Sequence, residues 1–154
     1  PYALLWANDK YYLAGNYEKY DTIGNYRIDR MRHTQITAKT IRPLQEVSIY
    51  QDYFDTADYL KKTFNMFSGT PQIIELQCKY DFLETFLDKF GDSVNIVEQT
   101  EQTFTVRAKV YSSSGLVEWL MQYGDRVTVI SPEDLKQQVV ERIQKMRKLY
   151  VFSS

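Results

Sequence analysis

The sequence predicts an α+β fold in which short strands come first and helices alternate with strands afterwards. Up to residue 50, apolar and polar residues alternate between clusters of turn-forming residues, which is typical of consecutive β-strands. From residue 70, apolar residues recur either every second position, which indicates a strand, or about every 3.6 positions, which indicates a helix. These segments follow one another in the order β-α-β-β-α-β, and one long helix ends the chain. The 154 residues have room for one ordinary domain or two small ones.

The first part, residues 1–50, reads as a series of strands with no helix between them. We expect strands over 2–6, 11–17 and 25–32, with Asn8 and Asp9 in the first turn. Another extended segment is expected over 35–45, where Pro43 favours the edge of a sheet. Consecutive short strands of this kind predict a small curled sheet or an open barrel.

A helix is predicted over residues 55–67, within a linker of residues 51–69. Asp55 is a good N-cap, because its side chain can accept a bond from the free backbone N–H groups of the first turn. Apolar residues then recur at helical spacing before Gly69, namely Ala57, Leu60, Phe64 and Phe67. The domain boundary is expected at residues 68–71.

The second part, residues 70–154, has the clearest pattern. Strands are predicted over 72–80, 94–99, 103–111 and 126–130, and helices over 81–91 and 116–123. Asp81 and Glu84 resemble a capping box, and Ser131 with Pro132 resembles an N-cap and first helical residue for the last helix. That helix is expected to point an apolar face inward, formed by Leu135, Val139, Ile143, Met146 and Tyr150. The βαββαβ order predicts a ferredoxin-like domain with an extra C-terminal helix.

Charge is unevenly distributed along the chain. The net charge is −1, so the whole chain is not an electrostatic binder of nucleic acid. Residues 27–42 nevertheless carry five basic side chains against the single acid Asp29, whereas residues 48–154 carry 12 basic and 15 acidic ones. This segment is either an anion-binding patch or an ordinary solvated surface. The 13 Tyr residues favour a half-exposed sheet, with an interface or a stacking platform as alternatives.

Catalytic and metal-binding patterns are weak, and we expect neither an enzyme nor a cofactor. Cys78 is the only cysteine and lies in an apolar strand, which predicts a buried, unreactive thiol. His33 is the only histidine and is expected at the surface. The serines before Gly115 are explained more simply by helix capping than by anion binding. No apolar run approaches the ~20 residues that span a bilayer, so we expect a cytoplasmic protein without membrane partners.

Two short motifs in the first part resemble a known family. Tyr11-Tyr12-Leu13 is followed by Tyr26-Arg27-Ile28-Asp29-Arg30-Met31, an order that resembles the WYL domain of bacterial transcription regulators. The resemblance implies an Sm-like (SH3-type) β-barrel, present here in part. Two departures are a Tyr at position 11, where the family has Trp, and Gly24, where many members carry an Arg.

The second part resembles the extension that often follows WYL domains. The resemblance rests on the helix end at residues 119–124, the strand-to-helix turn at residues 127–135, and the closing Leu149-Tyr150. In such regulators an N-terminal helix-turn-helix binds operator DNA, and the remainder senses an effector and helps dimerisation. Because the chain starts abruptly at Pro1, we expect a fragment in which the DNA-binding domain and the opening WYL strands are missing.

The resemblance also implies a ligand site on the two motif strands. The expected ligand is nucleotide-like, anionic or single-stranded nucleic acid, because arginine binds phosphate and tyrosine stacks on bases. The favoured residues are Tyr12, Arg27 and Arg30, with Tyr26 and Arg32 in secondary roles. Ion pairing of Asp29 with Arg27 or Arg30 is the competing structural interpretation. The alternative function is that of a dimerisation module that binds no ligand.

Overall fold

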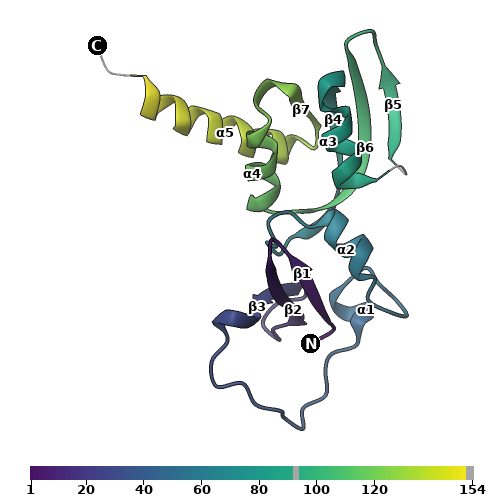
Figure 1. Ribbon diagram of the computed structural model, residues 1–154, viewed down its shortest axis with the longest axis vertical. Helices are drawn as coiled ribbons and strands as arrows, with labels where there is room; N and C mark the ends of the chain where they lie inside the picture. Colours follow the sequence, from purple (N-terminus) through teal and green to yellow (C-terminus); the bar gives the residue numbers. More distant parts are fainter. Residues whose placement is uncertain (92–93, 152–154) are drawn as a thin grey trace.

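The computed structural model describes residues 1–91 and 94–151, which form two antiparallel sheets joined by a helical segment (Figure 1). The first sheet has the order β1-β2-β3, and each strand pairs antiparallel with the next along the chain. Asn8 and Asp9 form the β1–β2 turn with φ of 51° and 56°, as the turn residues predict. The strands are β1 (Ala3–Ala7), β2 (Lys10–Asn16) and β3 (Ile23–Arg27).

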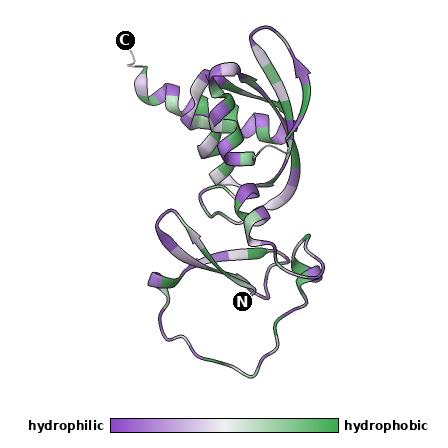
Figure 2. Cartoon of the chain, turned by 45° about the vertical axis from the view of Figure 1, so that its right-hand side comes forward, coloured by the Kyte–Doolittle hydropathy of each residue, from purple (hydrophilic) through white to green (hydrophobic). Residues whose placement is uncertain are grey.

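The first sheet ends earlier than the sequence predicts. β3 stops at Arg27, and a 3₁₀ turn over Ile28–Arg30 follows it. Residues 31–43 form neither strand nor helix and loop away from the sheet to α1 (Leu44–Val47) (Figures 1 and 2). The predicted continuation of the strand to residue 32 and the extended strand over 35–45 are therefore wrong. Both isoleucines of that loop are exposed, Ile36 fully and Ile41 to 56%, so the segment buries no apolar face against a sheet.

The linker helix, α2 (Thr56–Lys62), begins where the sequence predicts and ends five residues early. Asp55 caps it as expected, because its Oδ1 accepts a bond of 2.9 Å from the backbone N–H of Asp58. Its continuation to residue 67 is wrong. Asn65 and Met66 adopt left-handed φ angles of 49° and 59°, which turn the chain out of the helix.

The second sheet has the order β5-β6-β4-β7, and all its strand pairs are antiparallel. The predicted order of elements is confirmed, and the chain has a mixed α+β fold. Asp81 does not cap a helix, because it lies in a 3₁₀ turn over Tyr80–Phe82, and Pro132 occupies the N-cap of the last helix instead of its first position. The elements are β4 (Thr70–Lys79), α3 (Leu83–Phe90), β5 (Asn95–Gln99), β6 (Thr103–Ser112), α4 (Ser114–Gln122), β7 (Val127–Ser131) and α5 (Glu133–Tyr150).

The main core lies between the second sheet and its helices. It is rich in aromatic rings, including Phe82, Phe86, Phe104 and Trp119, and Cys78 is buried among its strands as predicted. A smaller core under the first sheet contains Leu5, Ala14, Ile23, Val47, Tyr59, Met66 and Tyr111. Because Tyr111 belongs to β6, the second sheet contributes directly to the core of the first. The two parts of the chain are thus packed together.

Only the beginning of α5 packs as the sequence predicts. Leu135 is fully buried and Val139 packs against the core, but Ile143, Met146 and Tyr150 are 49%, 41% and 76% exposed. Their predicted inward placement is wrong. An 18-residue helix is about 27 Å long, and α5 runs past α4 and β7, so that its second half projects from the body (Figure 1). No helix in the described ranges 1–91 and 94–151 is long and apolar enough to cross a membrane.

Lys89 of α3 ties the two parts together. Its Nζ donates hydrogen bonds to the carbonyl oxygens of Thr63 at 2.7 Å and Leu60 at 3.2 Å, at the end of α2. The same ammonium lies 4.3 Å from the centre of the Phe64 ring. Burial lowers the pKa of Lys89 to about 8, because the charged form loses water on folding. The residue is therefore a charged cap on α2 supplied by the second part of the chain.

This buried amine predicts that stability rises with pH above about 8. In the unfolded chain Lys89 titrates near the ordinary value of 10.5, so the unfolded state binds more protons between these two values, and the free energy of unfolding increases with pH. Urea unfolding of the wild type and Lys89→Met from pH 7 to pH 10 measures the effect. The stability of the wild type relative to the variant should grow across this range, and a constant difference would contradict the assignment.

Candidate functional site

An open groove of about 560 Å³ lies along the outer edge of β3. Four of the five residues that the sequence predicts for ligand binding line it, and Arg32 does not. The opposite wall comes from the turn that follows α2. The complete lining is Tyr12, Asn25, Tyr26, Arg27, Arg30, Met31, Asn65, Met66, Phe67 and Ser68.

The first wall is built by strand pairing and by the turn that ends β3. Tyr12 lies directly opposite Arg27 in the antiparallel register of β2 and β3. Strict strand alternation would place Arg27 and Arg30 on opposite faces. Because β3 ends at Arg27, the 3₁₀ turn over Ile28–Arg30 carries Arg30 back to the same groove.

Arg27 is engaged by a neighbouring carboxylate. Its Nε donates to Asp29 Oδ1 at 3.0 Å and its second guanidinium nitrogen donates to Oδ2 at 2.6 Å, a bidentate ion pair. The hydrogen bonds from Arg27 hold the pKa of Asp29 below its ordinary value, and the same bonds raise the pKa of Arg27. The structure thus contains the Arg27–Asp29 ion pair that was the structural alternative to ligand binding at this motif. A ligand phosphate would meet a guanidinium that is already oriented and partly neutralised.

Arg30 and Arg32 differ in their hydrogen-bond partners. Arg32 donates to the backbone oxygens of Met31 at 2.9 Å and Asp29 at 3.3 Å, and so braces the turn outside the groove. Across residues 1–91 and 94–151, the Arg30 guanidinium has no hydrogen-bond acceptor and no ion-pair partner within bonding distance. Arg30 is therefore the cation in this groove that is most available to an anion.

The second wall was not predicted, because residues 65–68 were assigned to the end of a helix and to a boundary. Asn25 connects this wall to the sheet: its Nδ2 donates to the Met66 carbonyl oxygen at 3.2 Å, while its Oδ1 accepts from the Tyr59 hydroxyl at 3.2 Å. Phe67, 45% exposed, and Tyr26, 42% exposed, present two aromatic rings to solvent here. Asn65 was the available signal, since asparagine is among the residues that most readily adopt left-handed turns.

Gly24 leaves room for Tyr26. A Cβ atom at Gly24 would lie 2.7 Å from the Tyr26 hydroxyl oxygen and 2.9 Å from ring carbons. The tyrosine ring therefore covers the position at which many proteins of the resembled family carry an arginine.

The remaining candidate chemistry lies apart from the groove. Burial raises the pKa of the free Cys78 thiol to about 12, which keeps it protonated and unreactive at neutral pH. His33 is exposed in the loop after β3, as predicted. Within the part of the chain that the structure describes, no three His, Cys, Asp or Glu residues are grouped so as to hold a metal ion.

Comparison with known proteins identifies the second part of the chain. No curated protein matches the sequence. Residues 74–147 match the WCX domain family, from β4 to the last turns of α5. WCX domains are the C-terminal partners of WYL domains in transcription regulators. This match is consistent with the resemblance of the chain to regulators in which a WCX domain follows a WYL domain.

Proposed function

We propose that this chain is the effector-sensing and dimerisation region of a bacterial, cytoplasmic transcription regulator. In this proposal the groove along β3 binds a nucleotide-like or other anionic ligand, or single-stranded nucleic acid. Binding controls the affinity of an N-terminal helix-turn-helix domain for operator DNA. The proposal is supported by the WCX domain at residues 74–147 and by the motif residues that line one groove.

The observation that carries the proposal is the convergence of charge and aromatic rings from four segments. Tyr12 comes from β2, Tyr26 and Arg27 from β3, Arg30 from the turn after it, and Phe67 from the far wall. A guanidinium recognises phosphate through two parallel N–H bonds, and aromatic faces stack on bases of any identity. A groove with an unpaired Arg30 beside exposed rings therefore fits a ligand that carries both a phosphate and a base.

The same proposal includes a finer description of the two parts. We assign the first to a partial Sm-like barrel, which the β1-β2-β3 meander supports. We assign the second to the ferredoxin-like fold with an added helix, which the β7-β4-β6-β5 order and the antiparallel pairing support. Neither part is proposed to catalyse a reaction.

The alternative is a structural module that dimerises the regulator and binds no effector. The Arg27–Asp29 ion pair favours it, because the pair satisfies one of the two groove arginines without a ligand. The two functions make opposite predictions for Arg30, which forms no ion pair or side-chain hydrogen bond within residues 1–91 and 94–151.

The test is the affinity of the chain for labelled nucleotides and for a labelled hexanucleotide, measured by fluorescence anisotropy. Arg30→Ala should weaken binding by about one to two decades, because it removes a charge-assisted contact of roughly 1.5–3 kcal/mol. Arg27→Ala should act in the same direction. Arg126→Ala is the control, since this arginine lies in the second part of the chain, in the 3₁₀ turn (Gly124–Arg126) that precedes β7. If both groove variants bind like the wild type, the structural module is the better account.

Salt dependence separates a phosphate contact from a neutral one. For a single strand, log K falls with log[salt] by about 0.7 for each phosphate neutralised, so two groove arginines predict a slope near −1.4 and Arg30→Ala a slope near −0.7. A slope that is unchanged in the variant would contradict a phosphate at Arg30.

Tyr12→Leu distinguishes stacking from packing. Tyr12 is partly buried against the smaller core, and leucine keeps most of that contact without the aromatic face. If Tyr12 stacks on a base, the variant should lose affinity by a similar factor and keep its stability. A fall in stability with intact affinity would place Tyr12 in the core alone.

A further inference from the structure

A second cavity, of about 590 Å³, lies between α2 and the C-terminal half of β6, and we call it the α2–β6 pocket. α2 packs against β6 here (Figure 1). β5 does not reach this part of the sheet, because its pairing with β6 begins at Asn95, opposite Arg107. Among the described residues, positions 108–112 of β6 therefore have only β4 as a strand partner. The pocket shares no lining residue with the β3 groove.

Part of the lining of the α2–β6 pocket is apolar. Ile73 of β4 lies directly opposite Lys109 of β6 and is 53% exposed. Ala57, Val94 and Phe90 line the same cavity, but Phe90 is only 8% exposed. The pocket volume lies within the ~300–1,000 Å³ of small-molecule sites. The walls therefore offer aliphatic contacts to a small ligand and no open aromatic face on which a base could stack.

Two lysines from different elements line the pocket and are available to an anion. Lys61 comes from α2 and Lys109 from β6. Within residues 1–91 and 94–151, neither forms an ion pair or a side-chain hydrogen bond. The Lys61 side chain extends toward the end of α3, because a Cβ atom on Gly91 would lie 3.3 Å from its Nζ. The two amines thus bring positive charge to the pocket from α2 and from the sheet.

The other charged groups of the pocket are held by neighbours. Arg107 donates two hydrogen bonds to Glu75 Oε1, at 2.9 Å from Nε and 2.5 Å from a terminal nitrogen. Lys62 forms an ion pair with Asp58, one turn earlier in α2. The Asp55 carboxylate caps α2 at its N-terminus, where the helix dipole favours a negative charge. The two remaining lysines are therefore the charges that a ligand would neutralise.

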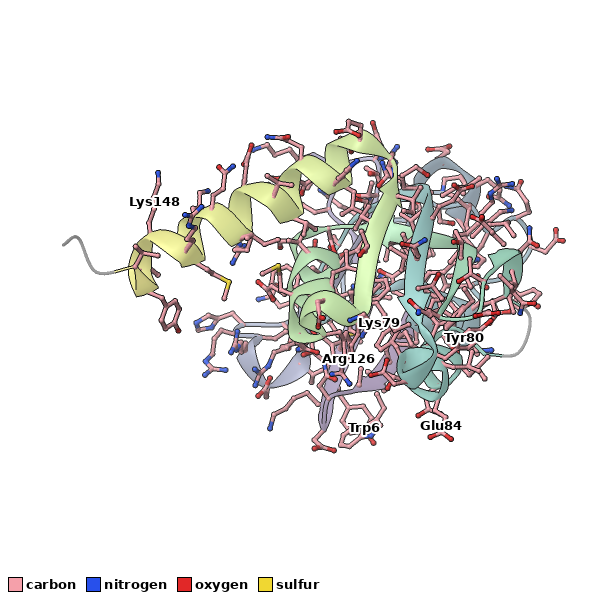
Figure 3. All side chains as sticks on the ribbon, turned by 90° about the horizontal axis from the view of Figure 1, so that it is seen from above. Trp6, Lys79, Tyr80, Glu84, Arg126 and Lys148 are labelled. Atoms are coloured by element: carbon pink, nitrogen blue, oxygen red, sulfur yellow. The ribbon has the colours of Figure 1, made fainter. Side chains whose placement is uncertain are left out.

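Lys148 shows how an ordinary surface lysine of this chain differs. It points away from the molecule on the projecting part of α5 (Figure 3). The hollow beside it is lined by α5 and Val151 alone, so no second element faces its amine. In the α2–β6 pocket, by contrast, α2, β4 and β6 all contribute to one cavity. An anion held there would contact charge and apolar surface at the same time.

We propose that the α2–β6 pocket binds a small amphipathic anion, an organic acid whose charged group lies between Lys61 and Lys109 and whose apolar body lies against Ile73 and Val94. This is a second ligand at a second site. A nucleotide is disfavoured here, because the pocket has no open aromatic face and its arginine already binds a carboxylate. The proposal involves no residue of the β3 groove, so it stands or fails independently of the proposed function.

Titration calorimetry with three probes separates the two halves of such a ligand. Octanoate carries both a negative charge and an apolar chain, and it should bind with a dissociation constant below about 1 mM. Octanamide has the same chain without the charge and should bind at least about tenfold more weakly. Acetate has the charge without the chain and should give no detectable binding at the same concentrations.

Single variants locate the octanoate. Lys61→Gln and Lys109→Gln should each weaken its binding by about tenfold, because each removes a charge-assisted contact. Both side chains are exposed, so the fold should persist, which circular dichroism checks. Lys148→Gln is the control and should bind octanoate like the wild type.

The outcomes decide the proposal without reference to the β3 groove. Equal affinity for octanoate and octanamide, no octanoate binding, or wild-type affinity in both pocket variants would overturn it. An equal loss of affinity in Lys148→Gln would also overturn it, because the anion would then be attracted by net charge alone. Arg30→Ala should leave octanoate binding unchanged, and an equal loss there would show that octanoate occupies the groove instead.

Discussion

Phe64→Ala should lower the free energy of unfolding by about 3–5 kcal/mol, the usual cost of removing a fully buried phenylalanine. Phe64 is 1% exposed and anchors the segment after α2 in the main core, between the second sheet and its helices. Its ring centre lies 5.2 Å from that of Trp119 and 6.0 Å from that of Phe90. The variant also removes the ring face that Lys89 approaches, so the charged cap on α2 loses a favourable contact.

The same substitution should weaken ligand binding indirectly. Phe64 precedes the Asn65–Ser68 turn, which forms the second wall of the groove. A wall whose anchor is lost samples more conformations, and binding must then restore the order. Tyr53→Ala is the control, because this side chain is 70% exposed and its loss should change stability by no more than ~0.5 kcal/mol. Urea unfolding followed by circular dichroism measures both variants, and equal midpoints would contradict the role assigned to Phe64.

Gly115→Val should be destabilising by about 3 kcal/mol or more, although a glycine inside a helix is ordinarily a weak point. Replacing glycine in a helix usually gains up to ~1 kcal/mol. Here a Cβ atom at Gly115 would lie 2.3 Å from the carbonyl oxygen of Phe64 and 3.0 Å from its carbonyl carbon. Backbone atoms cannot rotate away as a side chain can, so α4 and the α2–β4 connection would have to separate.

The neighbouring residue supplies the control for Gly115. Ser114 is exposed in the same turn of α4, and Ser114→Ala should have little effect or stabilise slightly. A stable Gly115→Val protein would show that α4 and the segment after Phe64 do not approach closely. The contact would then have no part in fixing the groove wall relative to the second sheet and its helices.

The order of elements could be predicted because hydrophobic periodicity is strong in the second part of the chain. In β6, for example, Phe104, Val106, Ala108 and Val110 alternate with more polar residues, and all four are buried as that pattern requires. The two strands that line the groove could be predicted from the order of the motif residues in the sequence. The structure brings Tyr12 and Arg27 together through a register that alternation alone does not specify.

The errors have a common physical cause: they depend on where neighbouring elements end. Periodicity predicts that Ile143 and Met146 share a face with Leu135, which is true, but it does not reveal that α4 and β7 are too short to cover them. Similarly, Phe67 continues the helical spacing of α2, yet the left-handed angles of Asn65 and Met66 end the helix and turn Phe67 into the groove wall. Tertiary contacts decided both cases against the local pattern.

NMR of the isotopically labelled chain tests most directly whether the groove along β3 is the ligand site. Backbone amide shifts are recorded while an unlabelled hexanucleotide, or a nucleotide, is added. We expect the shifts to concentrate at Tyr12, residues 25–31 and residues 65–68, and we expect Arg30→Ala to abolish most of them at the same ligand concentration. Shifts confined to the other basic surface, around Lys61, Arg107 and Lys109, or no shifts at millimolar ligand, would contradict it.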